Sequence, residues 1–162
     1  IVKDYHIVKL SPRDIDRVVE TGRKLHRLNR LEAKAMAEVI SHLKPDIAYI
    51  DASDVLPERF SRHIAEELTF NIEIVSEHKA DKTYPVVSAA SIIAKVERDK
   101  AIRDLRKKYG EVGSGYASDS RTIEFLEKWM RTHEDYPDFV RKSWAPAKRI
   151  KAACDKAQKR LF

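Results

Sequence analysis

Two short apolar runs separated by a helical pattern constrain the fold of this chain most. The runs are IAYI at 47–50 and IEIV at 72–75, and their length is typical of buried parallel strands. Between them, Pro57 marks a helix start, and apolar side chains recur at helical spacing over 60–68. Parallel strands need a crossover connection. Residues 46–75 therefore predict a strand, helix, strand unit of the α/β class.

A carboxylate follows each predicted strand. Asp51 comes directly after the first, and Asp81 lies just beyond the second. Ligands collect at the carboxyl ends of the strands in such units. The helix that starts at Pro85 carries Ser88 and Ser91 in its first turns, where free backbone N–H groups favour an anion. Two carboxylates beside a helix start of this kind indicate a metal-assisted phosphodiester site.

Each of these residues also has an ordinary structural interpretation. Asp51 and Asp81 can cap a turn or the following helix. Ser88 and Ser91 are small, so they can let their helix pack closely on the sheet. Lys79, in the loop before Asp81, can contact a substrate phosphate or be solvated. The residues alone leave both interpretations open.

The N-terminal part of the chain predicts one more strand and two helices. Residues 5–10 are rich in β-branched and aromatic side chains and predict a strand. Ser11 and Pro12 suit the cap and first position of a short helix. Asn29 and Glu32 form a capping-box pattern, which predicts a second helix from there to Pro45.

The C-terminal half predicts three helices. A long helix from Pro85 should end at Tyr109, with Gly110 as its terminator. The loop GSGYASDS follows, and Ser118 or Asp119 caps the next helix. The last helix, at 145–161, is basic, and Trp144 is expected to anchor it. Its cations predict sequence-independent contacts with a nucleic-acid backbone, although such a pattern is also typical of a solvated face.

Composition limits the classes of protein that remain. A length of 162 residues with 43% hydrophobic residues suits one domain, and the net charge of +6 is compatible with a polyanionic partner. A single cysteine, Cys154, excludes an intrachain disulfide, so a cytoplasmic location is expected. No apolar run has the roughly 20 residues needed to span a bilayer. The chain starts without methionine and in mid-pattern, as if a preceding segment had been removed.

Three motifs in order resemble those of the type 2 ribonuclease H family, ribonuclease HII, and most of all its archaeal branch. They are EHKADKTYPVVSAASIIAKVERD, YGEVGSGYASD and VRKSW. The resemblance implies an α/β ribonuclease H-like fold, a mixed five-stranded sheet flanked by helices. It also implies Mg²⁺- or Mn²⁺-dependent endonucleolytic cleavage of RNA in RNA/DNA hybrids, and of ribonucleotides embedded in duplex DNA. Residues 1–144 would form this catalytic domain, and 145–162 a basic C-terminal helix.

The resemblance also assigns roles to residues. It places two metal-binding carboxylates at Asp51 and Asp81. Tyr116, next to Gly115, falls on the tyrosine that packs on the sugar beside the ribonucleotide. The family's adjacent Asp-Glu pair on its first strand, and its glycine and arginine loop, have no counterpart in this sequence. We therefore expect an incomplete sheet that lacks the first two strands, with 5–10, 46–51 and 72–76 as its third, fourth and fifth.

The expected chemistry is hydrolysis by a two-metal-ion mechanism that leaves 5′-phosphate and 3′-hydroxyl ends. Because two carboxylates are too few ligands for two Mg²⁺ ions, we expect this chain to be inactive alone unless the missing segment is supplied in trans. Otherwise a monomer is expected, with no membrane partner. The first alternative is a non-catalytic nucleic-acid-binding fragment. The second, a nucleotide-binding α/β protein, is disfavoured because no Gly-rich phosphate loop follows the strand at 47–50.

Overall fold

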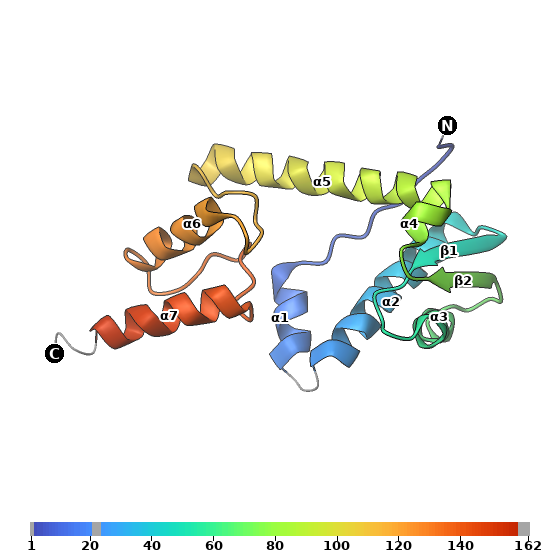
Figure 1. The fold of residues 1–162 in the computed structure, drawn as a ribbon, viewed down its shortest axis with the longest axis horizontal. Helices are drawn as coiled ribbons and strands as arrows, with labels where there is room; N and C mark the ends of the chain where they lie inside the picture. The colour runs from blue at the N-terminus through green and yellow to red at the C-terminus, as the bar shows by residue number, and fades with distance from the viewer. Residues whose placement is uncertain (1, 21–23, 159–162) are drawn as a thin grey trace. The chain divides into compact units, whose positions relative to one another are not determined.

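The computed structural model describes residues 2–20 and 24–158 (Figure 1). The chain forms two compact units. Residues 2–10, 17–20 and 24–95 belong to the strand unit, and residues 11–16 and 96–158 to the helical unit. Helices α1 (Pro12–Glu20) and α5 (Pro85–Tyr109) each contribute residues to both units. The predicted end of a catalytic domain at residue 144 is a functional boundary, which this division into compact units does not test. It stays a prediction.

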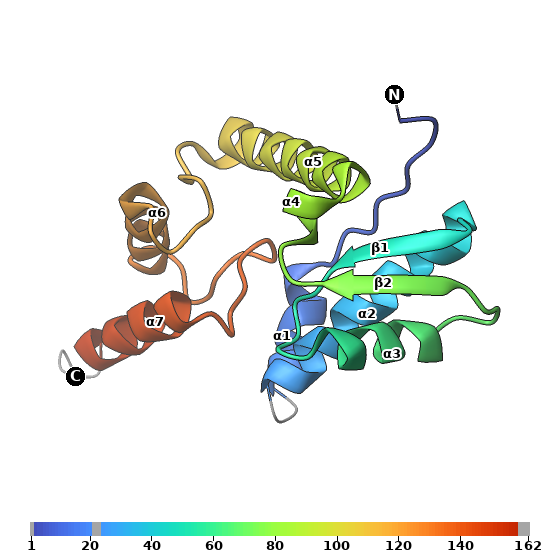
Figure 2. The same ribbon diagram turned by 45° about the vertical axis from the view of Figure 1, so that its right-hand side comes forward.

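The strand unit contains the predicted strand, helix, strand arrangement. Strands β1 (Ile47–Asp51) and β2 (Glu73–Glu77) are parallel, and α3 (Pro57–Glu66) connects them (Figure 2). The register pairs Ile47 with Glu73 and Asp51 with Glu77, so the two strands end side by side. Pro57 occupies the first turn of α3, as predicted.

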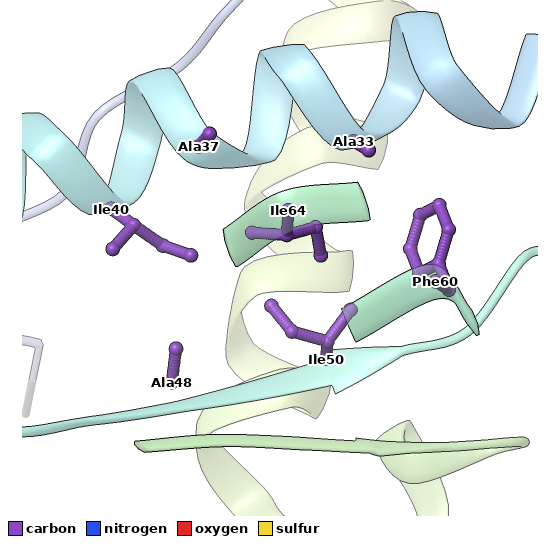
Figure 3. Close-up of a cluster of buried hydrophobic side chains, with 7 residues drawn as sticks. All are labelled: Ala33, Ala37, Ile40, Ala48, Ile50, Phe60 and Ile64. Atoms are coloured by element: carbon purple, nitrogen blue, oxygen red, sulfur yellow. The ribbon is translucent and has the colours of Figure 1, made fainter. Parts of the chain in front are cut away.

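Helices α2 (Lys24–Leu43) and α3 supply one side of the core of this unit (Figure 3). Phe60 and Ile64 of α3 are fully buried against Ala48 and Ile50 of β1. Helix α2 adds small residues at helical spacing, which let it approach α3 closely. Burying each large side chain contributes about 1.5–3 kcal/mol, so this cluster fixes β1 against the helices. The buried members are Ala33, Ala37, Ile40, Ala48, Ile50, Phe60 and Ile64.

The strand predicted at 5–10 does not form. Among the described residues the sheet consists of β1 and β2, and residues 5–10 are an irregular segment. A β-prone sequence becomes a strand only when a neighbour pairs with its backbone groups, and no described segment does so here. Instead, residues such as Tyr5, Val8 and Leu10 line an apolar cavity of about 480 Å³, with α2 and α5 on its other sides.

The helix start predicted at Asn29 is also wrong. Helix α2 already begins at Lys24, and Asn29 lies inside it, 4% exposed. Its amide Nδ2 donates to Oδ2 of Asp54 at 2.8 Å. The Asn29 and Glu32 spacing matches a capping box, but the asparagine serves a buried tertiary contact instead.

The helical unit confirms the predicted helix ends. Helix α5 ends at Tyr109, and Gly110 follows with φ +78° and donates its N–H to the Arg106 carbonyl oxygen. Asp119 caps α6 (Ser120–Met130) by accepting a hydrogen bond from the Arg121 N–H. The last helix, α7 (Ala145–Gln158), starts where predicted, and residues 159–161 of the prediction lie outside the described residues.

A second core joins α6 to α7. Leu126 and Met130 of α6 pack against Ala147 and Ile150 of α7. Trp144 packs on this cluster, as predicted. Asp16 adds a polar connection, because its carboxylate accepts hydrogen bonds from the backbone N–H groups of Lys142 and Ser143 and from the Ser143 hydroxyl. Although burial acts in the opposite direction, these bonds lower the pKa of Asp16. None of the helices that the structure describes is long and apolar enough to cross a membrane.

Candidate functional site

The carboxyl ends of β1 and β2 hold the residues that the sequence singled out. Asp51 is the last residue of β1 and is exposed. Its Oδ1 accepts a hydrogen bond of 3.3 Å from the backbone N–H of Ala80. Ala80 is fully buried and begins the short helix α4 (Ala80–Thr83), in which Asp81 is the next residue. The Asp51 carboxylate therefore lies next to the backbone of Asp81.

A tight turn makes this placement possible. Lys79 has φ +58° and ψ +35°, in the left-handed region that non-glycine residues seldom adopt. The turn lets the chain reverse after β2, so that the N–H of Ala80 faces Asp51. Lys79 itself is exposed. A strained residue held next to a candidate site is consistent with a functional constraint at this turn.

Glu77 and two tyrosines flank the same strand ends. Glu77, the register partner of Asp51, accepts a hydrogen bond of 2.9 Å from the Tyr84 hydroxyl. This bond raises the pKa of Tyr84 above its ordinary value. The Tyr84 ring packs against the ring of Tyr49, with 4.5 Å between the two ring centroids. Glu77 is thus already engaged by a neighbouring side chain.

A buried polar network holds the loop that follows Asp51. Asp54 is 1% exposed and accepts hydrogen bonds from the Leu56 N–H, from the Asn29 amide and from the Arg59 guanidinium. The hydrogen bond with Arg59 contributes most to holding the pKa of Asp54 far below its usual range. The network ties the loop to α2 and α3. Its role was not visible in the sequence, because nothing in the local pattern pairs Asn29 with Asp54.

The start of α5 is less open to an anion than the sequence suggested. The N–H groups of Val87 and Ser88 both donate to the Tyr84 carbonyl oxygen, at 3.0 and 3.1 Å. Pro85 has no N–H to offer. Ser88 and Ser91 are partly buried. Fewer backbone N–H groups are thus left for a phosphate at this helix start, and the contacts predicted for the two serines stay predictions.

The carboxylate oxygens at the strand ends are the type of ligand that a hard divalent cation prefers, but they are too few to hold one. Carboxylate oxygens are the ligands that Mg²⁺ and Mn²⁺ prefer. In residues 2–20 and 24–158, however, no group of three or more His, Cys, Asp or Glu residues is arranged to hold a metal ion. The metal-binding roles of Asp51 and Asp81 therefore stay predictions, and a metal site built on them would need further oxygen ligands.

The helical unit presents Tyr116 on a rigid loop. Gly113 and Gly115 have φ values of +68° and +77°, which favour glycine. The N–H of Ser114 donates to Asp119 at 2.7 Å, and the N–H of Gly115 donates to the Thr122 hydroxyl at 2.9 Å. Because these backbone groups are satisfied within the loop, its shape is set before any ligand binds. Tyr116 remains 55% exposed.

The fold of this chain belongs to the α/β ribonuclease H-like class. Solved structures support this class. A crystal structure of the ribonuclease H2 from Pyrococcus horikoshii OT3 covers 91% of this chain with a TM-score of 0.80 and 41% identity, over 68% of its own length. A structure of the PCNA:RNase HII complex from Archaeoglobus fulgidus covers 89% of the chain, with a TM-score of 0.74, 43% identity and 67% of its own length.

The chain belongs to the ribonuclease HII family. The family model described as Ribonuclease HII matches residues 4–147. The ribonuclease HII of Thermococcus kodakarensis is 47% identical over 152 residues, which are 93% of this chain and 64% of that protein. That of Methanocella arvoryzae is 48% identical over 159 residues, 98% of this chain and 69% of the relative. The chain thus spans about two thirds of the length of the curated relatives that it matches.

Proposed function

We propose that this chain carries part of the active site of an endonuclease that cleaves RNA in RNA/DNA hybrids and at ribonucleotides within duplex DNA. The products would be 5′-phosphate and 3′-hydroxyl ends. The observation that carries the proposal is the hydrogen bond from the Ala80 N–H to Asp51, which sets one carboxylate beside the backbone of Asp81. Membership of the ribonuclease HII family supports the same reaction.

Asp51 and Asp81 are the residues that would hold Mg²⁺ or Mn²⁺. Two divalent cations, when bound, neutralise charge on the phosphodiester and activate a water molecule. The role of the chain is to fix the carboxylates. Asp51 is held by the Ala80 N–H, and the loop after it is held by the buried Asp54. Since the described residues contain no group of three potential ligands, we propose that an Asp-Glu pair on a further segment completes the site.

Substrate binding would use a different set of residues. Tyr116, beside Gly115, offers an aromatic surface on which a sugar can pack. Lys79, exposed at the turn before Asp81, can reach a phosphate, and Ser88 and Ser91 are the candidates at the start of α5. We further propose that the protein acts as a monomer in the cytoplasm, which gel filtration and localisation of the tagged protein in cells would test.

The decisive experiment adds the missing carboxylates to the full chain. A peptide that carries a family-type first strand and its Asp-Glu pair is mixed with the chain, Mg²⁺ and a duplex containing one ribonucleotide. We expect cleavage only with this peptide, and none with a control peptide in which Asp-Glu is replaced by Asn-Gln. Strong cleavage without any peptide would show that the chain needs no further ligands.

The alternative is a nucleic-acid-binding fragment without catalysis. The net charge of +6 is compatible with such binding. A binding assay run beside the cleavage assay separates the two functions. Tight binding without cleavage, even when the peptide is present at saturating concentration, would support the alternative.

A further inference from the structure

Arg98 connects α5 to the loop that carries Tyr116. Its Nη2 donates a hydrogen bond of 2.5 Å to the Ser114 carbonyl oxygen. Its guanidinium carbon lies 3.9 Å from the centroid of the Tyr116 ring, in a cation–π contact. All three residues belong to the helical unit. One side chain therefore holds both the backbone of the loop and the ring that the loop presents.

Close packing of the loop on α5 strengthens this connection. A Cβ atom added at Gly115 would lie 3.2 Å from Cδ1 of Ile102 and 3.3 Å from Nη2 of Arg98. The missing side chain at Gly115 thus lets the loop backbone rest on the Arg98 side chain. Arg106 acts in a similar way further along α5, because its Nη2 donates to the Gly113 carbonyl oxygen at 3.0 Å. Arg98 differs in that it also contacts the tyrosine ring.

The chemistry of arginine explains the double contact. The guanidinium group is planar, so it can stack on an aromatic face while its N–H groups donate in the plane. A lysine ammonium group carries the same charge but cannot stack flat and donate to a chosen carbonyl at once. The Arg98 side chain, 35% exposed, therefore covers one face of the ring. Tyr116 nevertheless retains 55% exposure for a ligand.

We propose that Arg98 is a positioning residue that sets substrate specificity by fixing the Tyr116 ring. With one ring face against Arg98, the opposite face is oriented to pack on the sugar of the nucleotide beside the ribonucleotide. Discrimination between ribonucleotide-containing and all-DNA duplexes then depends on the guanidinium, although Arg98 itself need not touch the substrate. This inference rests on the proposed function, in which Tyr116 contacts the substrate.

The test measures binding of the full chain to two duplexes that differ only in one ribonucleotide. The ratio of the two Kd values defines the preference for the ribonucleotide. We expect Arg98→Met and Arg98→Lys each to lower this preference about five- to tenfold, as loss of a cation–π contact and a charged hydrogen bond implies. Arg103→Met is the matched control, since Arg103 is an exposed arginine of the same helix, and it should leave the preference unchanged.

A double variant separates positioning from an independent effect. If Arg98 acts through the ring, Arg98→Met should change nothing further in a Tyr116→Ala background. A loss that adds to that of Tyr116→Ala, or a normal preference in Arg98→Lys, would overturn the inference. If the unaltered chain binds both duplexes equally, the inference is refuted, whereas the proposed function is decided separately by the peptide-dependent cleavage.

An NMR measurement without nucleic acid tests the structural part on its own. In protein labelled with ¹³C-tyrosine, the ring signal of Tyr116 should shift in Arg98→Met and stay in place in Arg103→Met. An unchanged Tyr116 signal in a folded Arg98→Met protein would overturn the positioning role, whatever the chain binds. A thermal melt of each variant confirms that it is folded.

Discussion

The loop that carries Tyr116 and the strand ends that carry Asp51 differ in how completely this chain builds them. In the loop, the N–H groups of Gly113, Ser114 and Gly115 donate to side chains within residues 111–122. At the strand ends, by contrast, the polar contact that the structure shows for Asp51 is the one long hydrogen bond from Ala80. The loop is preorganised by its own hydrogen bonds, whereas the Asp51 carboxylate is held by a single contact.

This difference indicates that recognition and catalysis have different structural requirements. A recognition loop can be built from one short segment, because local hydrogen bonds fix its backbone. A two-metal site needs several oxygen ligands, which must come from strands far apart in sequence. The described residues of this chain accordingly contain the whole loop, and no group of three or more His, Cys, Asp or Glu residues arranged to hold a metal ion.

The largest expected effect concerns the carboxylates. In the chain supplemented with the Asp-Glu peptide, Asp51→Asn should lower the rate of Mg²⁺-dependent cleavage by a factor on the order of 10²–10³, because one charged ligand is lost. Calorimetric titration with Mn²⁺ should show weaker binding in parallel. Asp46→Asn, at an exposed residue just before β1, is the control. Equal rates for Asp51→Asn and the unaltered chain would remove Asp51 from the site.

A smaller effect is expected in the loop, where two glycines provide a matched pair. A Cβ atom at Gly113 would lie 2.3 Å from Oγ1 and 2.4 Å from the backbone N of Thr122, whereas one at Gly110 would meet nothing within 4 Å. Both residues have positive φ. We expect Gly113→Ala to lower the free energy of unfolding by about 2–4 kcal/mol and Gly110→Ala by about 1 kcal/mol.

Denaturant unfolding of the two variants measures this difference. Both variants place alanine at a positive φ, so this strain cancels when their free energies of unfolding are compared. The difference that remains reports the steric contact with Thr122. Similar losses for both variants would show that the loop moves aside easily and is not rigid. In that case the contrast between a preorganised loop and incomplete strand ends would no longer hold.

Local patterns in the sequence predicted much of this fold correctly. The unit of β1, α3 and β2, the end of α5 at Gly110 and the cap at Asp119 all follow from residues adjacent in sequence. The strand at 5–10 was predicted wrongly because pairing depends on a partner strand that the residues themselves do not specify. The start of α2 was missed because Asn29 bonds to Asp54, a contact between distant residues.

In the candidate site, too, local motifs pointed to some residues, whereas contacts between residues distant in sequence were not predicted. Motifs singled out Asp51, Asp81 and Tyr116 as candidates, since each lies in a short distinctive run, and their roles stay predictions. The residues that hold them in place were not found. Arg98 lies well before Tyr116 in the sequence, and only the folded chain shows that its guanidinium meets that ring.

A third prediction concerns the buried network behind Asp51. The folded pKa of Asp54 is lower than its unfolded value of 3.8, so the stability that its charge contributes is present above about pH 4 and is lost as the pH falls below it. Asp54→Asn should lower the free energy of unfolding by about 2 kcal/mol at pH 7. The difference in free energy of unfolding between Asp54→Asn and the unaltered chain should shrink between pH 4 and pH 2.

Stability measured by denaturant unfolding across this pH range tests the prediction. The control is again Asp46→Asn, which should leave the curve almost unchanged. A constant gap between Asp54→Asn and the unaltered chain at every pH would show that the loss is not electrostatic. The loop after Asp51 would then be held by packing rather than by the Asp54 charge.

The smallest effect is expected on α7, where the structure separates two kinds of cation. Lys148, Arg149 and Lys156 are exposed, whereas Lys151 donates to the Asp135 carboxylate at 2.8 Å. If α7 binds a nucleic-acid backbone, neutralising an exposed cation should reduce the slope of log Kd against log salt by at most about 0.9. Lys151→Gln should change this slope less, because its charge is already paired within the protein.

Comparing Lys148→Gln with Lys151→Gln tests whether the exposed cations of α7 contact the nucleic acid. Anisotropy titrations of a DNA duplex at several salt concentrations give the two slopes, and thermal melts show what each substitution costs in stability. Equal slopes for both variants would mean that pairing with Asp135 does not withdraw Lys151 from the surface. Unchanged slopes, even when Lys148, Arg149, Lys156 and Lys159 are neutralised together, would mean that α7 is a solvated face, and that duplex binding depends on the loop and strand ends alone.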